Sequence, residues 1–240
     1  EVMTEHRVGE QFQFSIGESS QVAEARRKAT ALACATGLDE NRAGICALVA
    51  SEMGTNLVKH AKEGEIFLRA ITEGAMQGIE VMALDRGPGM VNVSRALQDG
   101  YSTAGSSGTG LGAIVRMATE FDIFSMPGRG TGLVARVWKG AGLSASSPQV
   151  VRTGVINLAK TGESVSGDGW YSESSSRRTV CAVVDGLGHG PLAARAAVLA
   201  VESLREHHDA SLSEQIDFAH GALRSTRGAA LGVAEILHDQ

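Results

Sequence analysis

A carboxylate and an amide stand four residues apart in a stretch of the sequence with helical periodicity. At this spacing Glu52 and Asn56 fall on the same face of a helix. An amide oxygen is a suitable ligand for Mg²⁺, and a carboxylate one turn away can orient or deprotonate an attacking hydroxyl. The alternative is that both are ordinary polar residues on a solvated helix face.

A second cluster follows an apolar run that has the pattern of a strand. In residues 85–90 (DRGPGM), Asp85 stands at the strand end, where its carboxylate can accept a hydrogen bond from an exocyclic amine such as that of adenine. Gly87 and Gly89 permit positive φ and a close approach of the backbone to a ligand. An ordinary Asp-Gly turn, which Pro88 also suits, is the alternative.

A glycine-rich run then opens a predicted helix. In residues 105–112 (GSSGTGLG), backbone amides at the helix N-terminus can bind phosphate oxygens, and the glycines let the loop wrap around a triphosphate. The run is not a Walker loop, because no Gly-Lys-Ser/Thr ends it, nor a dinucleotide fingerprint, because a long loop precedes it. A flexible connector is the alternative.

Hydrophobic periodicity places these clusters on a series of elements. The first part of the chain predicts strands at 12–16, 65–71, 79–84 and on both sides of the 127–130 turn, and helices at 22–37, 39–60 and 111–121. The segment 140–148, rich in Gly, Ser and Ala, is typical of a linker. We therefore predict domains at 1–138 and 150–240, joined by residues 139–149.

The second domain carries two aspartates in glycine-rich runs, one of them directly after a predicted strand. Asp168 lies in the run SGDGW, and Asp185 lies in VVDGLGHG after the predicted strand 179–184. Facing carboxylates of this kind can bridge two Mg²⁺ or Mn²⁺ ions and activate water for phosphate-ester hydrolysis; two separate Asp-Gly turns are the alternative. Periodicity also predicts strands at 150–158 and 229–237 and helices at 191–206 and 212–224.

In their order along the chain, the first three clusters resemble the GHKL ATPase superfamily, and within it the anti-sigma and RsbT-like switch kinases. The resemblance covers most of residues 10–138. It implies an α/β (α+β) class, with a Bergerat-type mixed sheet covered by helices on one face. It also implies ATP and Mg²⁺ as ligands, with Glu52 as general base and Asn56 holding Mg²⁺. The implied nucleotide-binding residues are Asn56, Asp85, Gly87, Gly89, Ser102, Thr103, Gly108, Thr109, Gly110, Leu111, Gly112 and Thr131.

The second domain resembles the metal-dependent phosphatases of the SpoIIE and RsbX type. The resemblance implies part of an α/β/β/α sandwich, with Asp168, Asp185 and the Gly186 carbonyl as contacts for Mg²⁺ or Mn²⁺, and with His189 in a structural role. These phosphatases continue for several more strands and supply a further metal-binding Asp, whereas the present sequence ends at Gln240. We therefore expect little phosphatase activity from these 240 residues.

Composition argues against two classes of partner. The net charge of −5 and the sequence pI near 5.8 disfavour a nucleic-acid binder, which usually has a basic face. No run of ~18 apolar residues predicts a membrane span. Three cysteines without a metal-like or pairing pattern suit a reducing compartment. We therefore expect a cytoplasmic protein.

Together these features predict an ATP-dependent protein serine/threonine kinase of a bacterial partner-switching pathway, with an appended phosphatase module. Its partners would be a STAS-domain antagonist protein or a sigma factor. Ser106 and Ser107 stand where the anti-sigma branch commonly has a basic residue. This departure supports an alternative, an ATP-regulated module that sequesters such a partner without turnover. A sensor histidine kinase fragment fits less well, because His6 lies outside any long predicted helix.

Overall fold

The computed structural model describes residues 4–61, 63–73, 76–97, 110–140, 151 and 153–238. Contacts within the chain divide it into two compact units, Arg7–Ala145 and Ser146–Gln240, the latter together with Glu1–His6. The division after Ala145 falls inside the predicted linker 139–149. Because residues 141–150 lie outside the described ranges, the domain limits 1–138 and 150–240 stay a prediction.

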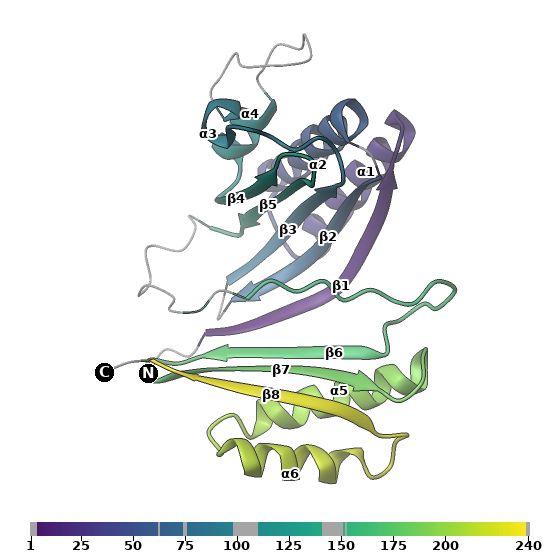
Figure 1. Cartoon of the computed structure of the whole chain (residues 1–240), viewed down its shortest axis with the longest axis vertical. Coiled ribbons are helices and arrows are strands. Elements are labelled where there is room, and N and C mark those ends of the chain that lie inside the picture. Colours follow the sequence, from purple (N-terminus) through teal and green to yellow (C-terminus); the bar gives the residue numbers. More distant parts are fainter. Residues whose placement is uncertain are drawn as a thin grey trace. The chain divides into compact units, whose positions relative to one another are not determined.

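The unit Arg7–Ala145 is a sheet with helices on one face (Figure 1). Its helices are α1 (Ser19–Ala35), α2 (Glu40–His60), the short α3 (Val93–Ala96) and α4 (Gly110–Met117). Neighbouring strands β2–β3, β3–β5 and β4–β5 are antiparallel. The predicted α+β class is therefore confirmed. In sheet order the strands are β4 (Glu120–Met126), β5 (Gly130–Trp138), β3 (Met76–Asp85), β2 (Gly64–Glu73) and β1 (Thr4–Ile16).

Alternation along β3 decides which of its side chains meet the helices. Ile79, Val81 and Ala83 are buried in the core that α1 and α2 cover, and period two places Asp85 on the same face. Residues at helical spacing form the buried stripe of α2, which runs from Ala43 to Leu57. The stripe fixes the rotation of α2, and with it the direction of the remaining polar face.

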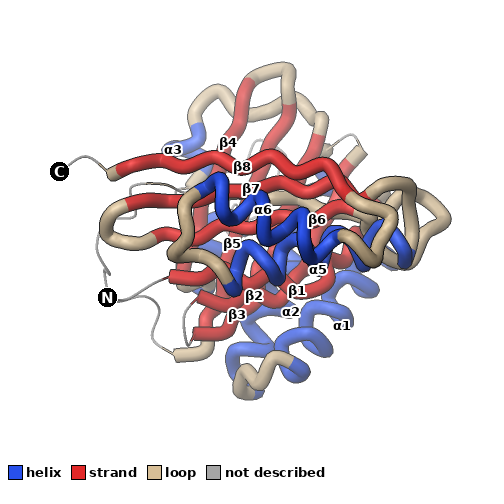
Figure 2. The backbone as a smooth tube through the Cα atoms, turned by 90° about the horizontal axis from the view of Figure 1, so that it is seen from below, coloured by secondary structure: helices blue, strands red, loops and turns tan. Residues whose placement is uncertain are grey.

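In the unit Ser146–Gln240, two helices lie across three antiparallel strands (Figure 2). The strands are, in order, β6 (Asp168–Ser174), β7 (Arg178–Gly186) and β8 (Ala229–Leu237); the first residues of β1 pair with the end of β6. The helices are α5 (Pro191–Glu206) and α6 (Leu212–Leu223). The buried face of α5 is largely alanine. Small side chains let α5 approach closely, since a Cβ on Gly169 would lie 3.3 Å from Ala197 Cβ.

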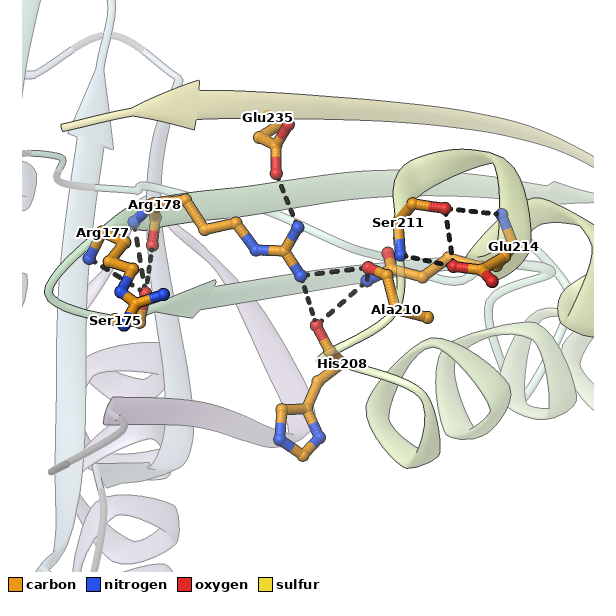
Figure 3. A network of polar contacts seen from close by, with 9 residues as sticks. Ser175, Arg177, Arg178, His208, Ala210, Ser211, Glu214 and Glu235 are labelled. Atoms are coloured by element: carbon orange, nitrogen blue, oxygen red, sulfur yellow. Dashed lines mark hydrogen bonds and ion pairs between the residues drawn. The ribbon is translucent and has the colours of Figure 1, made fainter.

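Arg178 joins the α5–α6 connection to the sheet (Figure 3). Its Nη1 donates to Glu235 Oε1 on β8 at 2.6 Å, and its Nη2 donates to the carbonyl oxygens of His208 and Ala210 at 2.7 and 3.0 Å. Ser211 then caps α6 in a reciprocal box with Glu214, and its hydrogen bonds lower the pKa of the Glu214 carboxyl. These contacts are structural and fix where α6 begins.

Most predicted elements are present, and the exceptions have physical causes. The helix predicted at 111–121 is wrong at its end: α4 stops at Met117 because Thr119 N–H already donates to Arg136 O, which brings the chain into β4. The strand predicted at 150–158 is also wrong, since Val151 and residues 153–158 have no strand partner. β6 was not predicted as a strand, because Asp168-Gly169 has the sequence of a turn. No helix in the described ranges is long and apolar enough to cross a bilayer.

Candidate nucleotide-binding site

The polar face of α2 meets the first residue of α4. A Cβ built on Gly110 would lie 3.1 Å from Glu52 Oε2, 3.4 Å from Asn56 Oδ1 and 3.7 Å from Asn56 Nδ2. The predicted shared face of Glu52 and Asn56 is therefore confirmed, and that face points at the N-terminus of the helix opened by the glycine-rich run. Only a residue without a side chain leaves this much room between α2 and α4.

Within the described residues, neither polar side chain of this pair has all of its hydrogen bonds satisfied. Asn56 Nδ2 is buried and has no hydrogen-bond partner among the described residues. Glu52, half-buried, makes no hydrogen bond or ion pair in the same part of the structure. A buried amide donor without a partner costs roughly 1–3 kcal/mol. The arrangement is thus one that a ligand with anionic oxygens and a cation would complete, because the amide offers both a donor and an oxygen.

Asp85 ends β3 in a turn that lies against the end of α2. Gly87 N–H donates to Asp85 Oδ1 at 2.6 Å, which leaves Oδ2 without a hydrogen bond among the described residues. A Cβ on Gly87 would lie 2.8 Å from His60 O and 3.3 Å from Ala61 Cα. The turn is therefore one helical turn beyond Asn56 along α2, and the first two predicted clusters converge.

Two further glycines allow separate stretches of backbone to lie in close contact beside Asp85. Gly130 has φ +98°, and a Cβ there would lie 1.9 Å from Asp85 O. Gly89 has φ +65°, and a Cβ there would lie 2.1 Å from Met126 O. Gly128 N–H also donates to Pro88 O at 2.7 Å. The loop after Asp85 is thus fixed to the β4–β5 turn by backbone contacts that no side chain could replace.

Three strands contribute one polar residue each to a row on the helix-covered face. In the sheet register Asp85 on β3 lies opposite Thr131 on β5, and Thr131 lies opposite Ser125 on β4. Opposite residues project to the same face, which is the face of Ala83 and Leu133 in the core. Asp85 and Thr131 were predicted as site residues from the sequence, whereas Ser125 was not. Alternation with Ile123 on β4 was the available signal for it.

The described ranges contain only part of the predicted glycine-rich site. Ser102, Thr103, Gly108 and Thr109 lie outside the described residues. Gly110 and Leu111 are half-buried in the first turn of α4, with Leu111 packed against the core, and Gly112 is buried. Their position at the start of α4 agrees with the predicted helix N-terminus.

An ion-pair network occupies the opposite face of the same sheet. Glu80 pairs with Arg69 Nη2 at 2.6 Å and with Arg136 Nε at 2.9 Å, and Arg136 also reaches Glu120. Burial lowers the pKa of Arg69. Burial acts in the same direction on Arg136, but Glu80 and Glu120 outweigh it and raise its pKa. The network joins β2, β3, β4 and β5 on the face opposite the helices, so it stabilises the sheet.

The two aspartates of the other unit oppose each other across neighbouring strands. Asp168 on β6 pairs in register with Asp185 on β7, and both are exposed. Gly186 lies close to α5, since a Cβ there would lie 2.3 Å from Ala193 O. His189 pairs with Glu163 rather than with either aspartate. No set of three or more His, Cys, Asp or Glu residues in the described ranges is placed to hold a metal ion. The pair is therefore the whole of the acidic site that the structure shows.

Comparisons with known proteins identify one family and several similar proteins. A family described as histidine kinase-like ATPase domain matches residues 17–137. The serine/threonine-protein kinase RsbT of Bacillus subtilis (strain 168) is 33% identical over 88 residues, 37% of this chain and 66% of RsbT. The phosphoserine phosphatase RsbX of the same organism is 28% identical over 90 residues, 38% of this chain and 45% of RsbX. A crystal structure of RsbX in complex with magnesium is 27% identical, covers 34% of this chain and 41% of that one, and has a TM-score of 0.33. The matches thus span less than two thirds of each relative's own length.

Proposed function

Because the chain belongs to the histidine kinase-like ATPase domain family, we propose that it is an Mg-ATP-dependent protein serine/threonine kinase of a partner-switching pathway. The observation that carries the proposal is the convergence of Glu52 and Asn56 on Gly110 at the start of α4. The similarity to RsbT supports the same substrate class, a serine or threonine hydroxyl on a protein.

The residues present fit an adenosine triphosphate with Mg²⁺. Asp85 accepts from Gly87 N–H with Oδ1, and its Oδ2, which has no hydrogen bond among the described residues, would accept from the adenine amine. The buried Nδ2 of Asn56 makes no hydrogen bond to any residue that the structure describes, and the Asn56 amide oxygen suits Mg²⁺. The α4 N-terminus offers backbone amides to phosphate oxygens. Asn56 would therefore hold the metal, and Gly110 and Gly112 the phosphates, together with the predicted Ser102, Thr103, Gly108 and Thr109.

Bound Mg²⁺ would neutralise charge on the phosphate oxygens. Phosphoryl transfer otherwise needs mainly positioning of the acceptor, because its transition state is loose. Glu52 is half-buried and pairs with no cation in the described ranges, so it could accept the proton of the acceptor hydroxyl. The proposed acceptor is a STAS-domain antagonist protein or another switch regulator such as a sigma factor.

The second unit is proposed as the appended phosphatase module. Asp168 and Asp185 in register, with the Gly186 carbonyl beside them, could contact Mg²⁺ or Mn²⁺. The similarity to RsbX supports a phosphoserine substrate. Because two carboxylates hold a dinuclear site poorly, we propose weak hydrolysis by these 240 residues.

Transfer of the γ-phosphoryl group to STAS-domain proteins tests the kinase directly. Labelled ATP is incubated with the chain and each candidate acceptor, and phosphoprotein is measured for the wild type, Glu52→Gln and Glu24→Gln. The expected result is a loss of roughly 10²–10⁴-fold for Glu52→Gln, with ATP affinity within a few-fold of wild type. Glu24, exposed on α1, serves as the matched control and should change nothing.

The same assay separates the kinase from a sequestering module. ATP-dependent capture of the partner without any phosphoprotein would favour the binding module, which the serines at 106 and 107 support. Unchanged transfer by Glu52→Gln would remove Glu52 from the proposed mechanism.

A further inference from the structure

Arg227 lies at the same end of the sheet as the two aspartates of the unit Ser146–Gln240. In the sheet register Asp168 on β6 lies opposite Asp185 on β7, and Asp185 lies opposite Ala230 on β8. Arg227 precedes Ala230 by three residues, in the connection that leads from α6 into β8. The end of β7 and the start of β8 therefore bring Arg227 to the end of the sheet where the acidic pair lies (Figure 1).

Hydrogen bonds hold the segment around Arg227 against the loop that follows Asp185. Leu187 N–H donates to Gly228 O at 3.0 Å, and Gly228 N–H donates to Thr226 Oγ1 at 2.9 Å. Both sequence neighbours of Arg227 take part in these contacts. The position of Arg227 beside the loop is therefore set by the backbone and does not depend on its own side chain.

The Arg227 side chain lies against the same loop. A Cβ built on Gly188 would lie 3.2 Å from Arg227 Nη1. The loop in turn contacts the backbone just before Asp168: Gly186 N–H donates to Gly167 O at 3.0 Å, and a Cβ on Gly167 would lie 3.7 Å from Gly188 O. Gly188 is therefore close both to the Arg227 guanidinium and to the residue before Asp168.

The guanidinium of Arg227 is available for a ligand in the part of the chain that the structure describes. Arg227 is exposed and makes no hydrogen bond or ion pair with any described residue. Glu163, a carboxylate that approaches the same loop, pairs with His189. A guanidinium can bind two oxygens of one phosphate group at once. It would also offset the repulsion between a phosphate dianion and the two aspartates.

We propose that Arg227 binds the phosphate group of the phosphoserine substrate, at the end of the sheet where Asp168 and Asp185 lie. The proposal rests on the proposed function of this unit, because it takes the two aspartates as the site of hydrolysis. The aspartates contact the metal ion, whereas Arg227 contacts phosphate oxygens. Arg227 therefore determines how tightly the anion binds and not how tightly the metal ion binds.

Binding of a phosphoserine analogue to the full chain tests the proposal. The analogue is a peptide with phosphonomethylalanine in place of phosphoserine, which carries a phosphonate group and cannot be hydrolysed. Its affinity is measured by calorimetry in the presence of Mn²⁺, and Mn²⁺ binding is measured separately by electron paramagnetic resonance. The wild type is compared with Arg227→Ala, Arg227→Lys and Asp185→Asn. Arg224→Ala, at an exposed position three residues earlier, is the matched control.

The variants should separate anion binding from metal binding. Arg227→Ala loses the charged hydrogen bonds to the anion, so it should bind the analogue roughly tenfold more weakly and Mn²⁺ within about twofold of wild type. Arg227→Lys keeps the charge without the fork of donors and should fall between the two. Asp185→Asn should lose Mn²⁺, and Arg224→Ala should match the wild type in both measurements. Because Arg227 bonds no described residue, its replacement should leave the melting temperature unchanged.

Three results would overturn the proposal: equal affinities of wild type and Arg227→Ala for the analogue, an equal loss in Arg224→Ala, or a wild type that does not bind the analogue. Mn²⁺ binding that survives Asp185→Asn would instead refute the metal site of the proposed function. Analogue binding that still depended on Arg227 in that case would support the anion contact while the metal site failed.

Discussion

Gly110 and Glu52, far apart in the sequence, approach so closely that a Cβ on Gly110 would lie 3.1 Å from Glu52 Oε2. The contact brings a carboxylate on the middle of α2 to the N-terminus of α4. Asn56 lies beside it, one helical turn further along α2. The space between these three residues is the place where the proposed triphosphate and its metal would bind.

Gly110→Ala should therefore affect binding more than stability. The added methyl narrows the space between Glu52 and Asn56, and overpacking of this size corresponds to ATP binding weaker by roughly tenfold. Helix propensity favours alanine over glycine by about 1 kcal/mol, so the melting temperature should not fall. Gly44→Ala, at an exposed position of α2 with open space around it, is the control. Calorimetry and thermal melts measure both; equal affinities for the two variants would contradict the assignment.

Gly130→Ala should destabilise the unit Arg7–Ala145. Its φ of +98° disfavours a side chain, and the new methyl would overlap Asp85 O, so the free energy of unfolding should fall by about 2–4 kcal/mol. Gly128 has φ +74° but nothing within 4 Å of its Cβ position. Gly128→Ala should therefore cost only about 1 kcal/mol. Urea denaturation of both variants separates the cost of backbone strain from the cost of steric overlap with Asp85 O. A similar loss in the free energy of unfolding for the two variants would show that the contact with Asp85 relaxes freely.

Removal of Glu80 should cost far more than removal of an exposed ion-pair partner. Glu80 is 2% exposed and bonds two arginines. Without its carboxylate two guanidinium groups would share a buried site, so Glu80→Ala should lower the free energy of unfolding by about 3–5 kcal/mol. Arg86→Ala, which removes a pair with Glu63 that is largely exposed on both sides, should cost under about 1 kcal/mol. Comparable losses in chemical denaturation would argue against a buried network.

The three cysteines should differ in reactivity. Burial raises the pKa of the Cys46 thiol to about 12, so at pH 8 roughly one thiol in ten thousand is ionised. Cys34 is exposed and Cys181 intermediate. Alkylation followed by mass spectrometry should label Cys34 first and Cys46 only in denaturant. Because the unfolded thiol ionises at lower pH, raising the pH above about 9 favours the unfolded state through Cys46. Native labelling of Cys46 at the rate of Cys34 would contradict its burial.

Local pattern was enough to predict the elements that carry the site. The i, i+4 spacing of Glu52 and Asn56 gave their shared face, and Asp39 marked the start of α2, where it accepts Arg42 N–H at 2.8 Å. Pro191 and the alanine-rich run after it gave both limits of α5. Each of these signals lies within a short stretch of sequence, so it can be recognised without knowledge of the tertiary fold.

Features that depend on strand pairing could not be predicted from the sequence. Ser125 joins Thr131 and Asp85 only through the register of three strands, which the β4–β5 turn sets. The segment 150–158 has β-branched residues but no partner strand in the described ranges, and a strand without a ladder does not form. Conversely, Asp168-Gly169 has turn chemistry, yet its pairing with Asp185 and Val184 holds it in β6.

Calorimetric titration of ATP, with Mg²⁺ and with a chelator, tests the central claim most directly when wild type is compared with Asn56→Ala. Asn41→Ala, the same substitution at an exposed position of the same helix, is the matched control. We predict that Mg²⁺ tightens ATP binding to wild type and to Asn41→Ala, and that Asn56→Ala loses this gain while it keeps its metal-free affinity. A full Mg²⁺ enhancement in Asn56→Ala, or no ATP binding by the wild type, would contradict the nucleotide site between α2, α4 and the end of β3.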